Sequence, residues 1–452
     1  MFESVIKDFA WVGLLLLIGT YLRAHVKILQ KLYIPNAVIA GFVGILLGPE
    51  VLGRFCPVYI HWSEYSGQYA TPLLAILFCV QFFGIRFNGK VIKRASAVWA
   101  IATITLGVQF LSAIPITKAF GLLDGFALLP QSAFYGGHGI PAVLTGIWEN
   151  LGYWDSTEAL TVGTTFATIG LLYGVIGGIV LINIAVRKNW LTGGSNIGKL
   201  SEEEATGYIQ LENRQKIMTT VTRSQTMNPM AFHVAIVFAL MLAAYTLLNG
   251  FKWLAANVPL FSSLANLNIM VPALIVSLVF GALASKTRLG EVCDEDSLKH
   301  VGSTSLEFLI ASSIAITDLD VVITYGAPML LISVIGLLLT TLCTLGLSKL
   351  WLRSNWFEHG VCMMGAYTGV LATGLMLLRI ADTDMKTDAS IDIITASPFW
   401  TITSQNFYLA IAPMMIVTAG GFTNLCSISA ALTIGLLIFG TIFYRVMGQG
   451  SN

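Results

Sequence analysis

Charged residues are scarce in this chain of 452 residues. Only 11% are Asp, Glu, Lys or Arg, whereas 56% are hydrophobic. A soluble core cannot hide so much apolar surface, so the scarcity of charge excludes an ordinary soluble globular protein. The net charge of +1 and the absence of a long basic run also exclude a nucleic-acid partner. A lipid bilayer is therefore the expected solvent and the first expected partner.

Cysteine pairs and the usual enzyme motifs are also missing. The six cysteines are scattered, without CxxC or His-interleaved spacing, so neither a disulfide framework nor a cysteine metal site is expected. No nucleophile–base pairing, HExxH helix, phosphate-binding loop or dinucleotide fingerprint is present. The sequence therefore predicts a protein that is not an enzyme and has no organic cofactor.

Long hydrophobic stretches are what the chain does have. Most of them approach the roughly 20 residues needed to cross a hydrocarbon core. They predict an all-α polytopic membrane protein with eleven candidate spans. These spans lie near residues 8–24, 34–50, 70–86, 95–117, 159–186, 230–249, 268–285, 303–322, 325–350, 396–418 and 422–445.

Two further apolar segments are interrupted by glycine, histidine or proline. They cover residues 126–148 and 358–380, and we expect them to be re-entrant or discontinuous. With the N-terminus outside and these two segments not crossing, 21 of the 25 basic residues fall on the inner side. This bias predicts a multi-pass protein of the inner (cytoplasmic) membrane with a cytoplasmic central linker.

The two membrane halves resemble each other weakly. Pro35 opens an apolar run that Pro272 echoes, and Gly139 and Gly374 lie at nearly the same offset within the two broken segments. In the topology above, the two copies have opposite orientations, which is a device of secondary transporters. We expect an N-terminal repeat (1–186), a linker (187–229), an inverted C-terminal repeat (230–418) and an additional span (419–452).

The first broken segment carries three glycines within the four residues Gly136, Gly137, His138 and Gly139. A continuous helix is not expected there, and exposed backbone amides or helix N-termini can bind an anion. The alternative is a tight turn at the bilayer surface. His138 could relay protons, or it could simply be satisfied by backbone contacts.

The second broken segment repeats threonine–glycine pairs, Thr368-Gly369 and Thr373-Gly374, and continues to Arg379. The threonine hydroxyls and nearby amides could bind a small anionic solute, and Arg379 could clamp a carboxylate. Alternatively, Arg379 extends to the cytoplasmic interface or pairs with a neighbouring aspartate.

Glu307 is an acidic residue within an apolar helix, close to Ser303 and Thr304. Carboxylates inside a membrane are costly and indicate function by default. A hard cation such as Na⁺ prefers oxygen ligands of this kind. The alternative is an interfacial glutamate at the cytoplasmic end of the helix.

Taken together, these segments resemble the bacterial sodium/glutamate symporter family. The resemblance covers most of the chain, roughly residues 5 to 415. Its motifs are Gly136–Gly139, Trp148–Gly152, Thr164–Gly178, Pro229–His233, Gly302–Leu309 and Thr368–Gly374.

The resemblance implies two inverted five-span repeats with paired re-entrant segments, Na⁺ as coupling ion, import of L-glutamate by alternating access, and a homodimer. This chain departs from the family pattern at Ile140-Pro141 and at Glu307, where aspartate is typical. Three readings therefore stay open: Na⁺-coupled glutamate symport, H⁺- or Na⁺-coupled transport of another dicarboxylate or hydroxycarboxylate, and a non-concentrating channel or sensor.

Overall fold

The computed structural model describes most of the chain as helices joined by turns and irregular segments. The residues outside this description are 1, 33, 82, 84–88, 193–202, 204–205, 207, 210, 214–220, 222–226, 259–266, 268, 288, 353–354, 383–385 and 448–452. Among the described residues there is no strand. Most of the expected 187–229 linker lies outside the described residues.

Seven of the described helices are long and apolar enough to cross a bilayer, which makes the chain a multi-pass membrane protein. Three further apolar helices are shorter, among them Met270–Ala284, which corresponds to the predicted span 268–285. The seven candidate spans are Phe2–His25, Asn36–Arg54, Ala95–Ala119, Ser156–Arg187, Pro229–Asn257, Gly326–Trp351 and Gly421–Tyr444.

The chain divides into two compact units, and each unit draws on both halves of the sequence. Unit 1 combines residues 1–21, 36–86 and 207–316. Its elements are α1 (Phe2–His25, to Tyr21), α3 (Asn36–Leu47), η1 (Leu52–Arg54), η2 (Ser66–Gln68), α4 (Ala70–Val80), η3 (Leu211–Asn213), α10 (Pro229–Asn257), α11 (Met270–Ala284), α12 (Leu289–Val292) and α13 (Glu295–Ala315).

Small residues let the helices of unit 1 approach closely. A Cβ added to Gly44 of α3 would collide with Ala315 of α13, and one added to Gly19 of α1 would lie 3.0 Å from the Ala40 backbone nitrogen. A second contact area buries Val80 of α4, Val237 of α10, Ala284 of α11 and Leu298 of α13, together with Phe83 and Cys293 from the segments that follow α4 and α12. Close backbone approach is how membrane helices gain dispersion energy, since lipid tails provide no hydrophobic driving force between helices.

A buried carboxylate on α1 binds the segment that carries Ser63 and Tyr69. Asp8 is 2% exposed. It accepts hydrogen bonds from the Ser63 hydroxyl at 2.5 Å, the Ser63 amide at 3.3 Å and the Tyr69 hydroxyl at 2.7 Å. Removal of this side chain leaves the part-buried Ser63 amide and the buried Tyr69 hydroxyl without their carboxylate acceptor.

We therefore expect Asp8→Ala to lower the free energy of unfolding by about 3 kcal/mol, because unpaired buried donors keep their full desolvation cost. Glu3→Ala on the same helix is the control, since Glu3 is exposed and pairs only with Lys7. Its effect should stay within about 0.5 kcal/mol. Thermal unfolding in detergent measures both, and equal melting temperatures would contradict the assigned role of Asp8.

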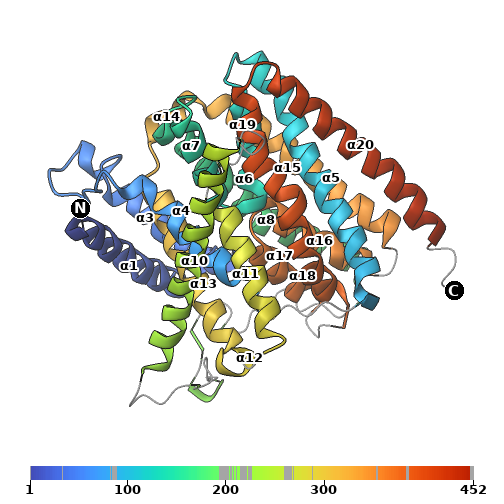
Figure 1. Cartoon of the computed structure of the whole chain (residues 1–452), viewed down its shortest axis with the longest axis horizontal. Helices are drawn as coiled ribbons and strands as arrows, with labels where there is room; N and C mark the ends of the chain where they lie inside the picture. Colours follow the sequence, from blue (N-terminus) through green and yellow to red (C-terminus); the bar gives the residue numbers. More distant parts are fainter. Residues whose placement is uncertain are drawn as a thin grey trace. The chain divides into compact units, whose positions relative to one another are not determined.

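Unit 2 combines residues 22–35, 87–206 and 317–452. Its helices, several of which Figure 1 labels, come again from both halves of the chain. They are α2 (Lys27–Lys31), α5 (Gly89–Ala119), α6 (Gly125–Gly136), α7 (Gly139–Asn150), α8 (Ser156–Arg187), α14 (Leu319–Thr324), α15 (Gly326–Trp351), α16 (Trp356–Thr368), α17 (Leu371–Ala381), α18 (Ala389–Trp400), α19 (Ala412–Val417) and α20 (Gly421–Met447).

The order of elements repeats along the chain. In the first half, α3 and α4 are followed by α5, the pair α6 and α7, and α8; in the second half, α11 and α13 are followed by α15, the pair α16 and α17, and α18. Each unit contains corresponding elements from both series. This order supports an internal repeat.

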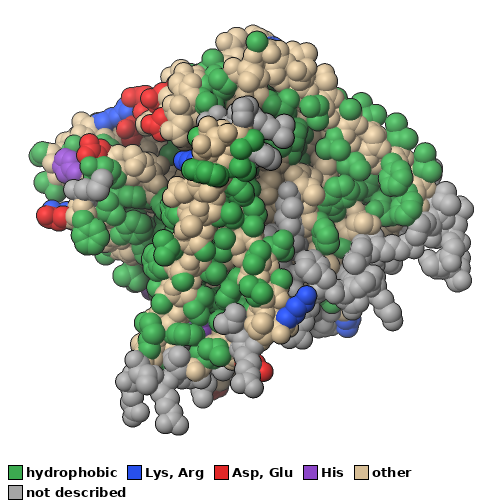
Figure 2. Space-filling model, viewed as in Figure 1, with side chains coloured by type: hydrophobic (Ala, Val, Ile, Leu, Met, Phe, Trp, Pro, Cys, Tyr) green, Lys and Arg blue, Asp and Glu red, His purple; other side chains and the backbone are tan. Residues whose placement is uncertain are grey.

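The last span packs onto the long helix α5, beside which it runs in Figure 1. A Cβ on Gly107 would collide with Thr433, and the Ser96 and Tyr444 hydroxyls are 2.8 Å apart. The other face of α20 exposes Ile434, Ile438 and other large apolar side chains. Figure 2 shows green hydrophobic side chains over this part of the surface. An apolar outer face of this kind suits contact with lipid.

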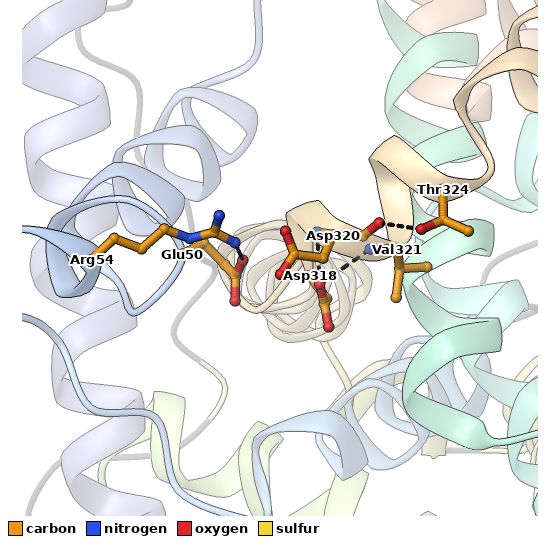
Figure 3. A network of polar contacts seen from close by, with 6 residues as sticks. All are labelled: Glu50, Arg54, Asp318, Asp320, Val321 and Thr324. Atoms are coloured by element: carbon orange, nitrogen blue, oxygen red, sulfur yellow. Dashed lines mark hydrogen bonds and ion pairs between the residues drawn. The ribbon is translucent and has the colours of Figure 1, made fainter.

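Local hydrogen bonds fix short polar segments at helix ends, which Figure 3 shows from close by. In unit 2, the Asp318 carboxylate caps α14 by accepting from the amides of Asp320 at 2.9 Å and Val321 at 3.2 Å. In unit 1, Arg54 pairs with Glu50 at 3.0 Å. The Asp318 contacts satisfy amides that lack partners in the first turn of a helix.

Candidate functional site at the two helix breaks

Both broken segments are pairs of short helices within unit 2. The first helix of each pair stops at a glycine: α6 ends at Gly136 before Gly137, and α16 ends at Thr368 before Gly369. The predicted discontinuities in 126–148 and 358–380 are thereby confirmed. The breaks pair Gly137 with Gly369, whereas Gly374, which the sequence paired with Gly139, lies inside α17.

The backbone at the first break requires glycine. Gly137 has φ +63° and ψ −155°, a combination that side-chain-bearing residues rarely adopt. A Cβ at this position would lie 2.8 Å from Cγ1 of Val370. The two breaks therefore touch each other, Gly137 against Val370, although they are more than 200 residues apart in the sequence.

Four helix ends meet where the breaks touch. The C-termini of α6 and α16 bring carbonyl groups, and the N-termini of α7 and α17 bring first-turn amides. In α17, the amides of Thr373 and Gly374 already donate to the carbonyl oxygen of Val370 at 2.9 and 3.3 Å. Neither His138 nor Val370 caps the following helix with its side chain. The arrangement offers partial positive and partial negative charge side by side within the protein.

His138 is buried, and only one of its two ring nitrogens has a hydrogen-bond partner in the described structure. Its Nε2 lies 2.9 Å from the Thr168 hydroxyl, which itself donates to the carbonyl oxygen of Thr164 at 2.9 Å. The hydroxyl of Thr168 must therefore accept from His138, which places a hydrogen on Nε2. Nδ1 has no partner in the described structure.

Thr368 is buried at the end of α16 and is bonded within its own helix. Its hydroxyl donates to the carbonyl oxygen of Met364 at 2.9 Å. Glycines of α8 make room for it, since a Cβ at Gly174 would lie 2.5 Å from the Thr368 hydroxyl. The glycine-rich span therefore brings α8 against the second break.

Thr373 and Gly374 lie in the first turns of α17. Thr373 is buried, and a Cβ at Gly369 would lie 3.1 Å from its hydroxyl oxygen. Gly374 packs against the backbone of α16 at Cys362 and Ala366, where a side chain would not fit. Of the sequence-predicted residues, the structure thus brings Gly136 to Gly139 together with Thr368, Gly369, Thr373 and Gly374.

Arg379 is not brought to the breaks. It is exposed in the last turn of α17. Eight residues of helix separate it from Leu371, which corresponds to about 12 Å at 1.5 Å per residue. A role for Arg379 at the breaks stays a prediction from the sequence.

The predicted cation ligands Ser303, Thr304 and Glu307 belong to α13 of unit 1, whereas the breaks belong to unit 2. All three are exposed. The Ser303 and Thr304 hydroxyls donate to the carbonyl oxygen of His300 at 3.1 and 2.7 Å. The spacing of three and four residues places the three side chains on one face of α13.

Sequence reasoning missed an aromatic cluster at the breaks. The rings of Tyr135 and Tyr367 stack with centroids 5.0 Å apart, and Trp400 meets both edge-on at 5.9 and 5.5 Å. Each tyrosine stands two residues before the glycine of its break. The shared Tyr-x-Gly pattern was the signal that could have identified them.

The family model for the sodium/glutamate symporter matches residues 3–369, which include the first helix break and reach Gly369 at the second. Comparison with the curated proteins finds no match. Because the family model covers most of the chain, from α1 to the second break, the protein belongs to the sodium/glutamate symporter family.

Proposed function

We propose that this protein imports L-glutamate, or a similar anionic amino acid, together with Na⁺ by alternating access. The observation that carries the proposal is the contact of the two helix breaks, Gly137 against Val370, inside one unit. Discontinuous helices that meet at depth in a membrane protein are typical of solute sites in secondary transporters. Membership of the sodium/glutamate symporter family supports the choice of ion and solute.

The amides at the N-termini of α7 and α17 are the proposed partners of the solute's carboxylates. No Lys or Arg is buried among the residues that the structure describes, so none of these residues offers a buried cationic side chain to bind a carboxylate. Neutral amides aligned with a helix dipole bind anions without the cost of burying a permanent positive charge. Gly136, Gly137 and Gly139 allow a ligand to approach the backbone closely.

We propose that unit 2 moves as a rigid body together with the site, which produces alternating access. Both breaks, His138 and the aromatic cluster belong to unit 2, and each unit contains corresponding elements of the two halves. Inverted orientation of these halves, an outside N-terminus, insertion in the inner membrane and a homodimer are part of the proposal. Two near-equivalent conformations of such repeats can expose one site to opposite sides in turn.

We propose that Glu307, Ser303 and Thr304 of α13 are the Na⁺ ligands, on chemical grounds. Their oxygens are of the hard type that alkali and alkaline-earth cations select. Coupling by H⁺ is the second candidate, favoured by the open Nδ1 of buried His138. A proton there would alter the charge next to the first break.

Radiolabelled uptake into proteoliposomes tests the proposal. We expect L-glutamate to accumulate under an inward Na⁺ gradient and not under an equal K⁺ gradient. Accumulation driven by a proton gradient without Na⁺ would favour the H⁺-coupled reading. Equilibration without accumulation under either gradient would indicate a channel or sensor.

A further inference from the structure

The aromatic cluster at the breaks lies among oxygen atoms that have no partner. Tyr367 is fully buried and Tyr135 is 7% exposed, yet neither hydroxyl makes a hydrogen bond in the described structure. Gln131, one helical turn before Tyr135 on α6, and Gln109 on α5 are equally buried, and the Oε1 atom of each is unpartnered. Residues four apart share a helix face, so Gln131 and Tyr135 lie on the same side of α6.

The amide of Gln109 is fixed in one orientation. Its Nε2 lies 2.8 Å from the carbonyl oxygen of Tyr367 and 2.9 Å from the Thr340 hydroxyl. The Thr340 hydroxyl already donates to Gly336 at 2.7 Å, so both partners of Nε2 are acceptors. Both amide hydrogens are used, and Oε1 is left as a free acceptor.

Four buried oxygens that can accept hydrogen bonds are therefore unpaired on the two tyrosines and the two glutamines: two phenol hydroxyls and two amide carbonyls. Buried polar atoms are nearly always paired, so a group of unpaired ones indicates a polar ligand. Trp400 adds a third aromatic ring at the residue where α18 changes into the π-helical segment Thr401–Gln405. Such π-helical turns occur frequently at functional sites.

We propose that Tyr135, Tyr367 and Trp400, with Gln109 and Gln131, bind the α-ammonium group of the transported solute. This inference rests on the proposed function and assigns the residues that would distinguish an amino acid from a dicarboxylate that lacks an amine. Neutral oxygen acceptors together with aromatic rings suit an organic ammonium, which has three hydrogens to donate and is attracted to π-faces. A bare Na⁺ ion would gain less from the rings, and the two amide carbonyls of Gln109 and Gln131 are fewer carbonyl ligands than a hard cation usually takes.

Competition experiments on the purified protein in proteoliposomes test this. Glutarate has the carbon chain and both carboxylates of glutamate but no amine. We expect it to compete with radiolabelled L-glutamate at least about a hundredfold more weakly than unlabelled L-glutamate does, because a site with buried acceptors rejects an analogue that leaves them unpaired. Equal competition by the two compounds would overturn the proposal.

Two variants locate the effect. Tyr367→Phe and Gln131→Met keep the volume of each side chain but remove its oxygen acceptor. Each should weaken L-glutamate binding about tenfold, the usual effect of losing one hydrogen bond to a charged group, while glutarate binding is unchanged. Tyr444→Phe is the control. The hydroxyl of Tyr444 on α20 lies 2.8 Å from that of Ser96 on α5, so this variant loses a tyrosine hydroxyl that is not part of the aromatic cluster.

The half-saturating Na⁺ concentration separates the remaining outcomes. If the two variants raise it and leave the preference for glutamate over glutarate intact, the oxygens bind Na⁺ and the proposal is wrong. If the wild type binds L-glutamate in preference to glutarate but shows no Na⁺-driven uptake, the proposed function fails while the ammonium site stands. Absence of glutamate binding altogether would overturn both.

Discussion

Gly137→Ala is expected to reduce glutamate uptake at least tenfold, to about a tenth or less of the wild-type rate, while the protein still inserts in the membrane. Left-handed backbone of this kind costs a residue with a Cβ about 1–3 kcal/mol. The added atom would also lie 2.8 Å from Cγ1 of Val370, so the two breaks would have to separate. Both effects act at the point where the breaks touch.

Gly146→Ala is the matched control for this prediction. Gly146 lies on α7, the helix that follows the same break, and no heavy atom lies within 4 Å of a Cβ placed there. Uptake by this variant should equal that of the wild type. The double variant Gly137→Ala with Val370→Ala removes the Cγ1 atom and should recover part of the activity. Unchanged uptake by Gly137→Ala alone would contradict the proposed site.

A buried pair between His359 of α16 and Asp392 of α18 predicts the second large effect. His359 Nε2 lies 3.1 Å from Asp392 Oδ2, and the two side chains are 4% and 0% exposed. His359 Nδ1 lies 2.9 Å from the carbonyl oxygen of Asn355 and must carry a hydrogen.

Asp392→Leu should lower the free energy of unfolding by about 3–5 kcal/mol, because it breaks a buried pair and leaves His359 without its acceptor. His359→Leu should be similarly destabilising. The double variant should be more stable than either single one, since it leaves neither partner alone. Thermal unfolding in detergent, followed by the tryptophan fluorescence, measures all three, and simple additivity of the two losses would contradict the pairing.

The sequence was most informative where the physics is local. Hydrophobic length predicted the long helices, since a bilayer requires about 20 apolar residues whatever the tertiary fold. Glycines predicted both interruptions, because glycine readily adopts a positive φ such as that of Gly137, at which a residue with a Cβ is strained. The motifs around these interruptions also pointed to the family that the comparison identified.

The sequence did not predict which distant segments lie close together in space. It paired Gly139 with Gly374, whereas the helices break at Gly137 and at Gly369, because spacing along the chain does not tell at which glycine a helix stops. It stressed Arg379, an exposed residue, because a charge in an apolar run stands out. It passed over Tyr135 and Tyr367, since aromatic residues are ordinary in membrane helices.

The sequence by itself thus determined that the chain is a multi-pass helical membrane protein with two interrupted segments of a recognisable family. Composition determines that the surroundings are lipid and how long the spanning helices are. Single residues such as glycine determine where the backbone leaves the helical conformation. Only the tertiary structure decided that the two interruptions touch and that Tyr135, Tyr367 and Trp400 form one cluster beside them. Such contacts depend on how helices far apart in the chain pack against one another, which no local pattern of residues encodes.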